Sequence, residues 1–174
     1  MSTNLQTAPT AVFPPKISAV VRDAAIEFFG TYCGMQPCER QDEPVVAGGG
    51  GIMGVISFFG DPVWSVALIL PEATAVTAAK LFAGFEIAFE SQDMGDIVGE
   101  MANVMAGDIV ARLDAIGMAS QMSLPTVARG NDVELLSPSN ACATRIKFES
   151  PNGEFWFRLV KALDKLPGVR RSGT

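Results

Sequence analysis

GDIVGEMANVMAGDIVARL, residues 95–113, is a long helical pattern that organises the rest of the chain around it. Four of its residues recur at spacings of 4, 3 and 4: Asp96, Glu100, Asn103 and Gly107. Because each helical residue turns by about 100°, these four fall within an arc of roughly 60°. The apolar residues that point the other way are expected to form the buried stripe: Ile97, Met101, Val104 and Met105. One helix is therefore expected to present a carboxylate and a carboxamide, one turn apart, on its outer face.

The flanks of this outer face are unusually small residues: Gly95, Gly99, Ala102, Ala106 and Gly107. A glycine inside a helix costs about 1 kcal/mol relative to alanine, so the glycines weaken the helix without local gain. Such local violations tend to occur at functional sites. Two interpretations stay open: a bare surface that lets another backbone approach, or a solvated face whose glycines relieve crowding inside this protein.

Composition excludes several classes of protein. The 174 residues suit one domain or at most two small ones, and 48% hydrophobic against 18% charged residues indicates a folded globular chain. A net charge of −6 argues against nucleic-acid binding, since the only local basic cluster is Arg170–Arg171. No apolar run reaches the roughly 18 residues of a membrane span. Residues 1–15 lack the pattern of a signal peptide, so we expect a cytoplasmic protein with a disordered N-terminal tail.

The chain contains no histidine, which excludes zinc sites of the Cys/His type and histidine-based catalytic triads. Its three cysteines are Cys33, Cys38 and Cys142. We interpret them as small core or loop residues, because a catalytic thiolate would lack its usual imidazole base. The glycine run at 48–51 is followed by neither Lys nor Ser/Thr, so it is not a phosphate-binding loop.

The order of predicted elements indicates an α+β fold, in which long helices pack on a mostly antiparallel sheet. The predicted helices cover residues 16–29, 72–83 and 91–116. Residues 33–51 are expected to be a loop, and 132–137 are ambiguous. One hairpin is predicted over 52–70, turning at Gly60–Pro62, and another over 141–163, turning at Pro151–Gly153. Between them, 121–130 is strand-like but interrupted at Pro125. Residues 167–174 are expected to be a tail.

GDIVGEMANVMAG resembles the central motif of the CheC/CheX/FliY response-regulator phosphatases of bacterial chemotaxis. That motif places Asp or Ser, Glu, Asn and a more distant Pro, which correspond here to Asp96, Glu100, Asn103 and Pro125. The likeness spans roughly residues 16–163, so a single CheX-like domain is expected over 16–166. The CheC and FliY branches tend to carry two such motifs. The first helix offers only Ser18, Arg22 and Ala25 at the equivalent spacing, so the chain is most similar to the single-motif CheX type.

The resemblance implies a CheC-like fold and a hydrolase activity, the dephosphorylation of the phosphoaspartate of a CheY-like response regulator. The implied catalytic pair is Asn103, which would position a water, and Glu100, which would pair with the lysine beside the receiver's phosphorylation site. Asp96 would support that docking contact, Gly107 would clear room for the partner, and Pro125 would be structural. No cofactor or metal is expected on this chain, because the receiver carries the Mg²⁺.

The resemblance also implies a homodimer formed through sheet edges. Trp64 and Trp156 are expected to be core or interface residues. Two other interpretations stay open: a non-catalytic adaptor or switch module that binds a receiver or a flagellar component, and an unrelated α+β domain with a coincidental motif.

Overall fold

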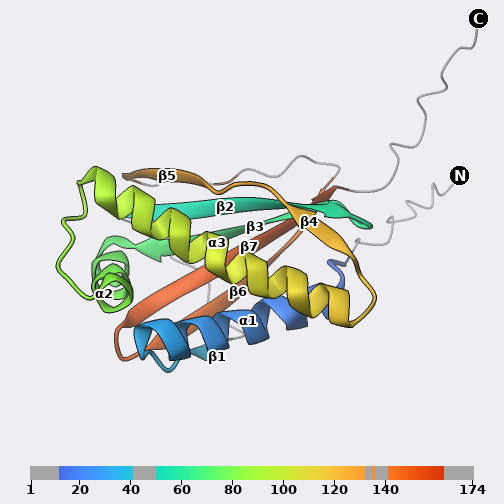
Figure 1. Ribbon diagram of the computed structural model, residues 1–174, viewed down its shortest axis with the longest axis horizontal. Helices are drawn as coiled ribbons and strands as arrows, with labels where there is room; N and C mark the ends of the chain where they lie inside the picture. Colours follow the sequence, from blue (N-terminus) through green and yellow to red (C-terminus); the bar gives the residue numbers. More distant parts are fainter. Residues whose placement is uncertain (1–11, 41–49, 132–134, 136–140, 163–174) are drawn as a thin grey trace, which may run out of the picture.

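The computed structural model describes residues 12–40, 50–131, 135 and 141–162, and Figure 1 shows their arrangement. Three helices are present in this part of the chain: α1 (Pro15–Cys33), α2 (Glu72–Ala83) and α3 (Gln92–Ala115). The strands are β1 (Cys38–Arg40), β2 (Gly50–Gly60), β3 (Trp64–Pro71), β4 (Ser120–Met122), β5 (Thr126–Asn131), β6 (Ala141–Ser150) and β7 (Gly153–Ala162).

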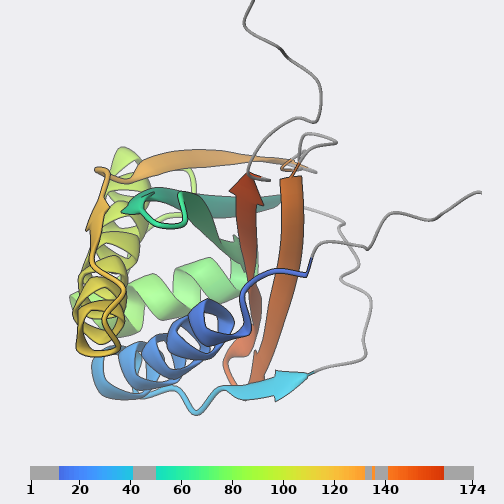
Figure 2. The same cartoon turned by 90° about the vertical axis from the view of Figure 1, so that its right-hand side faces the viewer.

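The strands form one seven-stranded sheet in the order β1-β6-β7-β3-β2-β4, with β5 also paired to β2. Every pairing is antiparallel. The sheet curls around the helices, so that one of its faces encloses them (Figure 2). The predicted α+β fold with a mostly antiparallel sheet is therefore confirmed.

Both predicted hairpins are present, as β2–β3 and β6–β7. The second turns at Gly153, whose φ of 122° lies in a region that side chains rarely adopt. The strand-like segment at 121–130 is broken into β4 and β5 just before Pro125, as its proline predicts. The expected loop at 33–51 is wrong in part, because Cys38–Arg40 pairs with β6 and β2 already begins at Gly50.

Several predicted segments fall on parts of the chain that the structure does not describe. Residues 1–11 of the expected N-terminal tail and all of 167–174 lie outside the described residues, as does most of the ambiguous stretch 132–137. The described end of the N-terminal segment packs against the core: Phe13 is buried, and its ring meets Trp64 edge to face at 6.1 Å. Helix α1 then begins at Pro15.

The buried apolar side chains of the helices and of the enclosing sheet face form one hydrophobic cluster. Aromatic rings link its layers. Phe29 of α1 lies 4.2 Å from Phe155 of β7, and Phe58 of β2 stacks at 4.2 Å on Trp64 of β3. Trp64 is thus a core residue, whereas Trp156 lies half-buried on β7. Rings of this size make the largest contributions to core burial, so the sheet and helices are held as one packed unit.

The three cysteines differ in their burial. Cys33 and Cys142 are buried, and Cys38 is exposed on β1. Burial raises the pKa of the Cys33 thiol to about 11, because an apolar environment disfavours the thiolate. The expectation of unreactive core residues therefore holds for Cys33.

Candidate functional site

Helix α3 carries the candidate site, and both of its ends are fixed by local hydrogen bonds. At the N-terminus, the Met94 N–H donates to Ser91 Oγ at 3.3 Å, so Ser91 is the N-cap of α3. At the C-terminus, Gly117 adopts a φ of 77° and the Met118 N–H donates to the Leu113 carbonyl at 2.9 Å. The site residues lie in the interior of this helix, where the backbone is rigid.

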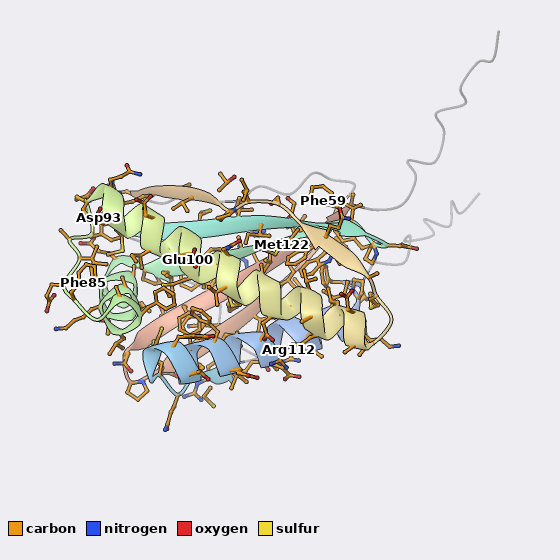
Figure 3. The ribbon with its side chains drawn as sticks, in the orientation of Figure 1. Phe59, Phe85, Asp93, Glu100, Arg112 and Met122 are labelled. Atoms are coloured by element: carbon orange, nitrogen blue, oxygen red, sulfur yellow. The ribbon has the colours of Figure 1, made fainter. Side chains whose placement is uncertain are left out.

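The predicted polar face of α3 points into solvent. Asp96, Glu100 and Gly107 are exposed and Asn103 is half-exposed. Figure 3 shows Glu100 on the side of the helix that faces away from the sheet. Within the described part of the chain, the side chains of Asp96, Glu100 and Asn103 form no hydrogen bond or ion pair. The carboxylate and the carboxamide are therefore available to a molecule outside this subunit.

The small residues beside that face divide into two groups, and the prediction that all of them flank an open surface is wrong. Gly99, Ala102 and Ala106 are buried. A Cβ added at Gly99 would lie 3.4 Å from Val127 Cγ2, and one added at Gly54 of β2 would lie 2.9 Å from Ala102 Cβ. The small residues Gly54 and Ala102 thus let α3 approach β2 closely, because larger side chains at this contact would separate the two layers.

Gly95 and Gly107 behave differently, since a Cβ added at either position would meet nothing within 4 Å. Packing in the described structure therefore does not require glycine at these two positions. The glycines thus differ in their surroundings: Gly99 is buried, at a position where an added Cβ would contact Val127 and Pro125, while Gly95 and Gly107 leave bare helix surface. Burial of the expected apolar stripe is also uneven, with Met101 and Met105 fully buried and two members only partly so, Ile97 and Val104.

The face carries uncompensated negative charge. Exposed carboxylates at Asp93, Asp96 and Glu100 follow one another along its N-terminal half. The arginine that lines a groove with Asp96, Arg129, is already engaged, since it pairs with Glu90 at 3.5 Å and donates to the Phe89 carbonyl at 2.6 Å. Further along the helix, Arg112 pairs with Asp108 at 2.7 Å and also with Glu27. The hydrogen bond to Asp108 raises the pKa of Arg112, so this arginine stays charged within its network. The carboxylates of Asp93, Asp96 and Glu100 have no partner in the described structure, so they are available to a cation of another molecule.

Two hollows lie beside the face, one on each side of α3. A groove of about 230 Å³ runs between the start of α3 and β5, and Asp96 and Arg129 are among its lining residues. A smaller one of about 140 Å³ lies between α1 and α3, lined in part by Tyr32, Val104 and Asp108. Neither hollow is lined by Glu100 or Asn103, so this pair suits contact with a protein surface rather than enclosure of a small molecule.

Helix α1 offers no second site of the same kind. At the equivalent spacing, Ala25 is buried and Arg22 forms an ion pair with Glu39, in which Nη2 lies 3.0 Å from Oε1. The Ser18 hydroxyl contacts the Pro14 carbonyl at 3.5 Å. The chain therefore presents one Glu/Asn pair in the part that the structure describes.

The loop between β4 and β5 also borders the site. Pro125 Cγ would lie 3.8 Å from a Cβ at Gly99, which directly precedes Glu100. The predicted structural role of Pro125 agrees with this packing. Next to it, Leu124 is 84% exposed. Sequence reasoning did not single out Leu124, although a leucine before a proline in a broken strand pattern was a usable signal.

The described residues contain neither a metal-binding cluster nor a membrane-spanning helix. No cluster of three or more Cys, Asp or Glu side chains in this part of the chain is arranged to hold a metal ion. None of its helices combines the length and the apolar character that crossing a bilayer demands.

A long helix that exposes a Glu/Asn pair above a curled antiparallel sheet defines a CheC-like protein. The family described as "Chemotaxis phosphatase CheX" matches residues 52–149, over half of the chain, and the chain belongs to this family. The resemblance noted from the motif is therefore confirmed. No curated protein matches the chain.

Solved structures agree with this assignment. The chemotaxis protein CheX from Desulfovibrio desulfuricans is 25% identical, with a TM-score of 0.73 over 84% of this chain and 99% of its own. CheX from Vibrio vulnificus is 16% identical, with a TM-score of 0.74 over 83% and 97%. A CheX–CheY–BeF₃–Mg²⁺ complex from Borrelia burgdorferi contains a chain 18% identical, with a TM-score of 0.64 over 85% and 98%. The last two, being below 25% identity, establish the shared fold.

Proposed function

We propose that this protein is a phosphatase that hydrolyses the phosphoaspartate of a CheY-like response regulator. The observation that carries the proposal is the Glu100/Asn103 pair, which has no partner among the described residues and lies on the solvent face of a long helix. Family membership and a related CheX whose structure contains CheY support the same choice of partner.

The proposed reaction needs little chemistry from this chain. A water oxygen attacks the phosphorus, the bond from phosphorus to the aspartyl oxygen breaks, and inorganic phosphate and the free carboxylate leave. Phosphoryl transfer of this kind is catalysed mainly by positioning and charge stabilisation. Mg²⁺ is expected on the receiver, where it offsets the phosphoryl charge, and no metal is assigned to this chain.

Asn103 is the residue that positions the water in this scheme. Its carboxamide can accept a hydrogen bond from the water and donate another, so it can fix both the position and the orientation of the nucleophile. Being neutral, it is not repelled by the phosphoryl oxygens. Positioning of this kind is expected to speed hydrolysis about a hundredfold, which corresponds to about 3 kcal/mol of barrier.

Glu100 is assigned to docking. A carboxylate close to an anionic phosphoryl group would be repelled, whereas it would attract a lysine beside the receiver's phosphorylation site. Asp96 lies one turn earlier and adds to the same negative field, and Gly107 leaves room for the partner's backbone.

The direct test is the decay of phosphorylated receivers from the same organism, measured with and without this protein. We expect faster release of phosphate from at least one of them. A receiver that binds tightly but decays at its own rate would favour the alternative function, a non-catalytic adaptor or switch. Decay that is unchanged for every receiver, without binding, would refute the proposal.

Two further expectations belong to the same proposal. A homodimer would form through a sheet edge, and the edges of the described sheet are β1 on one side and β4 with β5 on the other. Unpaired backbone groups at such edges can accept a further strand. The protein is expected in the cytoplasm together with its receiver.

A further inference from the structure

The corner between β4 and β5 holds an apolar side chain out in solvent. Leu124 is 84% exposed, among the most exposed large hydrophobic residues that the structure describes. Its backbone is nevertheless fixed. The Ser123 N–H donates to the Ser57 carbonyl at 2.9 Å, the Ser57 N–H donates to Ser123 Oγ at 3.0 Å, and that hydroxyl donates to the Leu124 carbonyl at 2.8 Å. Leu124 is thus presented by a preorganised loop.

This corner lies directly beside the candidate site. Pro125, the next residue, packs where α3 passes Gly99, and Glu100 follows at once. Figures 1 and 2 both show the connection from β4 to β5 running alongside the middle of α3. A partner that covers Glu100 and Asn103 would therefore meet Leu124 at the rim of the same contact.

An exposed leucine alone is unremarkable, since much of any protein surface is apolar. Here three features coincide: near-complete exposure, a hydrogen-bonded backbone, and contact between its loop and the helix that presents the polar pair. A fixed apolar group loses little conformational entropy when a partner covers it. In protein interfaces, a few residues that fill well-packed pockets of the partner carry most of the binding energy.

We propose that Leu124 is an apolar anchor for the receiver domain, and that it enters an apolar recess next to the receiver's phosphorylation site while Glu100 pairs with the adjacent cation. This inference rests on the proposed function, since it assigns a residue to the same docking event. The receiver is favoured as occupant because the loop that holds Leu124 packs against α3 at Gly99, next to Glu100, and the exposed carboxylates of α3 have no partner among the described residues and attract a cation. A second copy of this chain is the competing occupant.

The test compares Leu124→Ala with Leu81→Ala, a matched control for an exposed leucine on α2. Binding is titrated with a purified CheY-like receiver activated by beryllofluoride and Mg²⁺, which cannot be hydrolysed. We expect Leu124→Ala to weaken binding about tenfold or more, as loss of a buried leucine side chain implies. Leu81→Ala should bind like the wild type, and both variants should melt like it.

Three further readouts separate this role from others. With phosphorylated receiver, Leu124→Ala should raise KM and leave kcat unchanged, because an apolar docking contact binds the ground state and the transition state equally well. The weakening should be the same at low and high salt, since an apolar contact is not screened, whereas the contribution of Glu100 should shrink as salt rises. Sedimentation of the variant should show the oligomeric state of the wild type.

Equal receiver affinity for Leu124→Ala and the wild type would overturn the inference and leave the proposed function standing. A variant that loses self-association but keeps its receiver affinity would assign Leu124 to a second copy and overturn the inference as well. If the wild type binds a receiver without speeding its decay, the proposed phosphatase activity is refuted. The receiver affinities of Leu124→Ala and the wild type then still decide whether Leu124 is an anchor. If the wild type binds no receiver at all, the proposed function fails, and the inference fails with it.

Discussion

Glu100 and Asn103 lie one turn apart on α3, yet the two side chains suit different tasks beside a phosphoryl group. A carboxylate contributes charge that repels phosphate and attracts a cation, whereas a carboxamide contributes directed hydrogen bonds without charge. Substitutions at the two positions should therefore affect different measurements, with binding changed at Glu100 and rate at Asn103.

Glu100→Lys is expected to weaken binding to a phosphorylated receiver at least about tenfold, because a favourable charge pair becomes a repulsive one. Asp114→Lys is the matched control. It makes the same charge change at an exposed position of α3, about 21 Å further along the helix, and should bind nearly as the wild type. Titration with the beryllofluoride-activated receiver measures both. Equal affinities for the two variants would remove the docking role of Glu100.

Gly107→Ala should stabilise the fold and weaken docking at the same time. An added Cβ meets nothing within 4 Å in this chain, so the helix should gain about 0.5–1 kcal/mol in free energy of unfolding. The same methyl group would occupy space that the proposed partner needs. Gly95→Ala is the control, because it adds the same methyl group to exposed surface about 18 Å from Gly107 along the helix. Denaturant unfolding and receiver titration should separate the two effects, and unchanged docking in Gly107→Ala would contradict the assigned role.

At this scale the sequence predicted the open face correctly, because a spacing of 4, 3 and 4 fixes angular position on any α-helix. It could not predict the burial of Gly99, Ala102 and Ala106. Small residues predict bare surface when side-chain size alone is considered. Here they lie on the side of α3 that packs against the sheet, where Ala102 faces Gly54 of β2. Only the position of Gly54 on β2, far away in sequence, shows that approach.

At the scale of elements, α3 lies in a corner with strands on one side and helices on the other. Its buried arc is therefore shifted from the predicted apolar stripe toward Gly99, Ala102 and Ala106. Ile97 and Val104 lie at the other margin of this arc, so they are only partly buried. The close approach of α3 to β2 also sets how far the Glu/Asn face stands from the rim formed by the β4–β5 loop.

Gly54→Ala tests that approach. The new Cβ would lie 2.9 Å from Ala102 Cβ, so α3 or β2 must shift, at a cost of about 1–3 kcal/mol. For a chain of this length each kcal/mol lowers Tm by about 2–4 °C. Adding Ala102→Gly removes the opposing methyl group, so the double variant should lose less stability than the sum of the single ones. Strict additivity in thermal unfolding would contradict the close contact.

Strand β1 is the element that the sequence did not predict. Its three residues have no apolar alternation, and they pair with β6 residues more than 100 positions later. The hairpins, by contrast, were predictable because both strands and their turn are contiguous. Non-local pairing of a short polar segment leaves no pattern in the local sequence, so β1 was assigned to a loop.

At the scale of the whole molecule, the curled sheet packs its aromatic rings inward and leaves the outer face of α3 uncovered. The cysteines report on this packing. Cys38 should react with Ellman's reagent in the native protein, because it is exposed. Cys33 and Cys142 should react only after unfolding. For Cys33, burial adds a chemical barrier, since a pKa of about 11 keeps the thiol protonated near neutral pH. Three thiols reacting at equal rates without denaturant would contradict the packed core.

The overall architecture could be predicted from the order of elements and from the family motif, while the curl of the sheet could not. That curl arises from the pairing of β1 with β6 at one end and of β2 with β4 and β5 at the other. The β4–β5 loop packs against α3 at Gly99, which directly precedes Glu100. This contact joins segments that are apart in the sequence, which explains why sequence reasoning found the polar pair but not Leu124.

The most direct test of the proposed function is Asn103→Ala, assayed with one receiver for both phosphate release and binding. We predict that the variant folds, binds the beryllofluoride-activated receiver as the wild type does, and loses the acceleration of about a hundredfold. Phosphate release by Asn103→Ala at the wild-type rate would contradict the central claim that this carboxamide positions the attacking water.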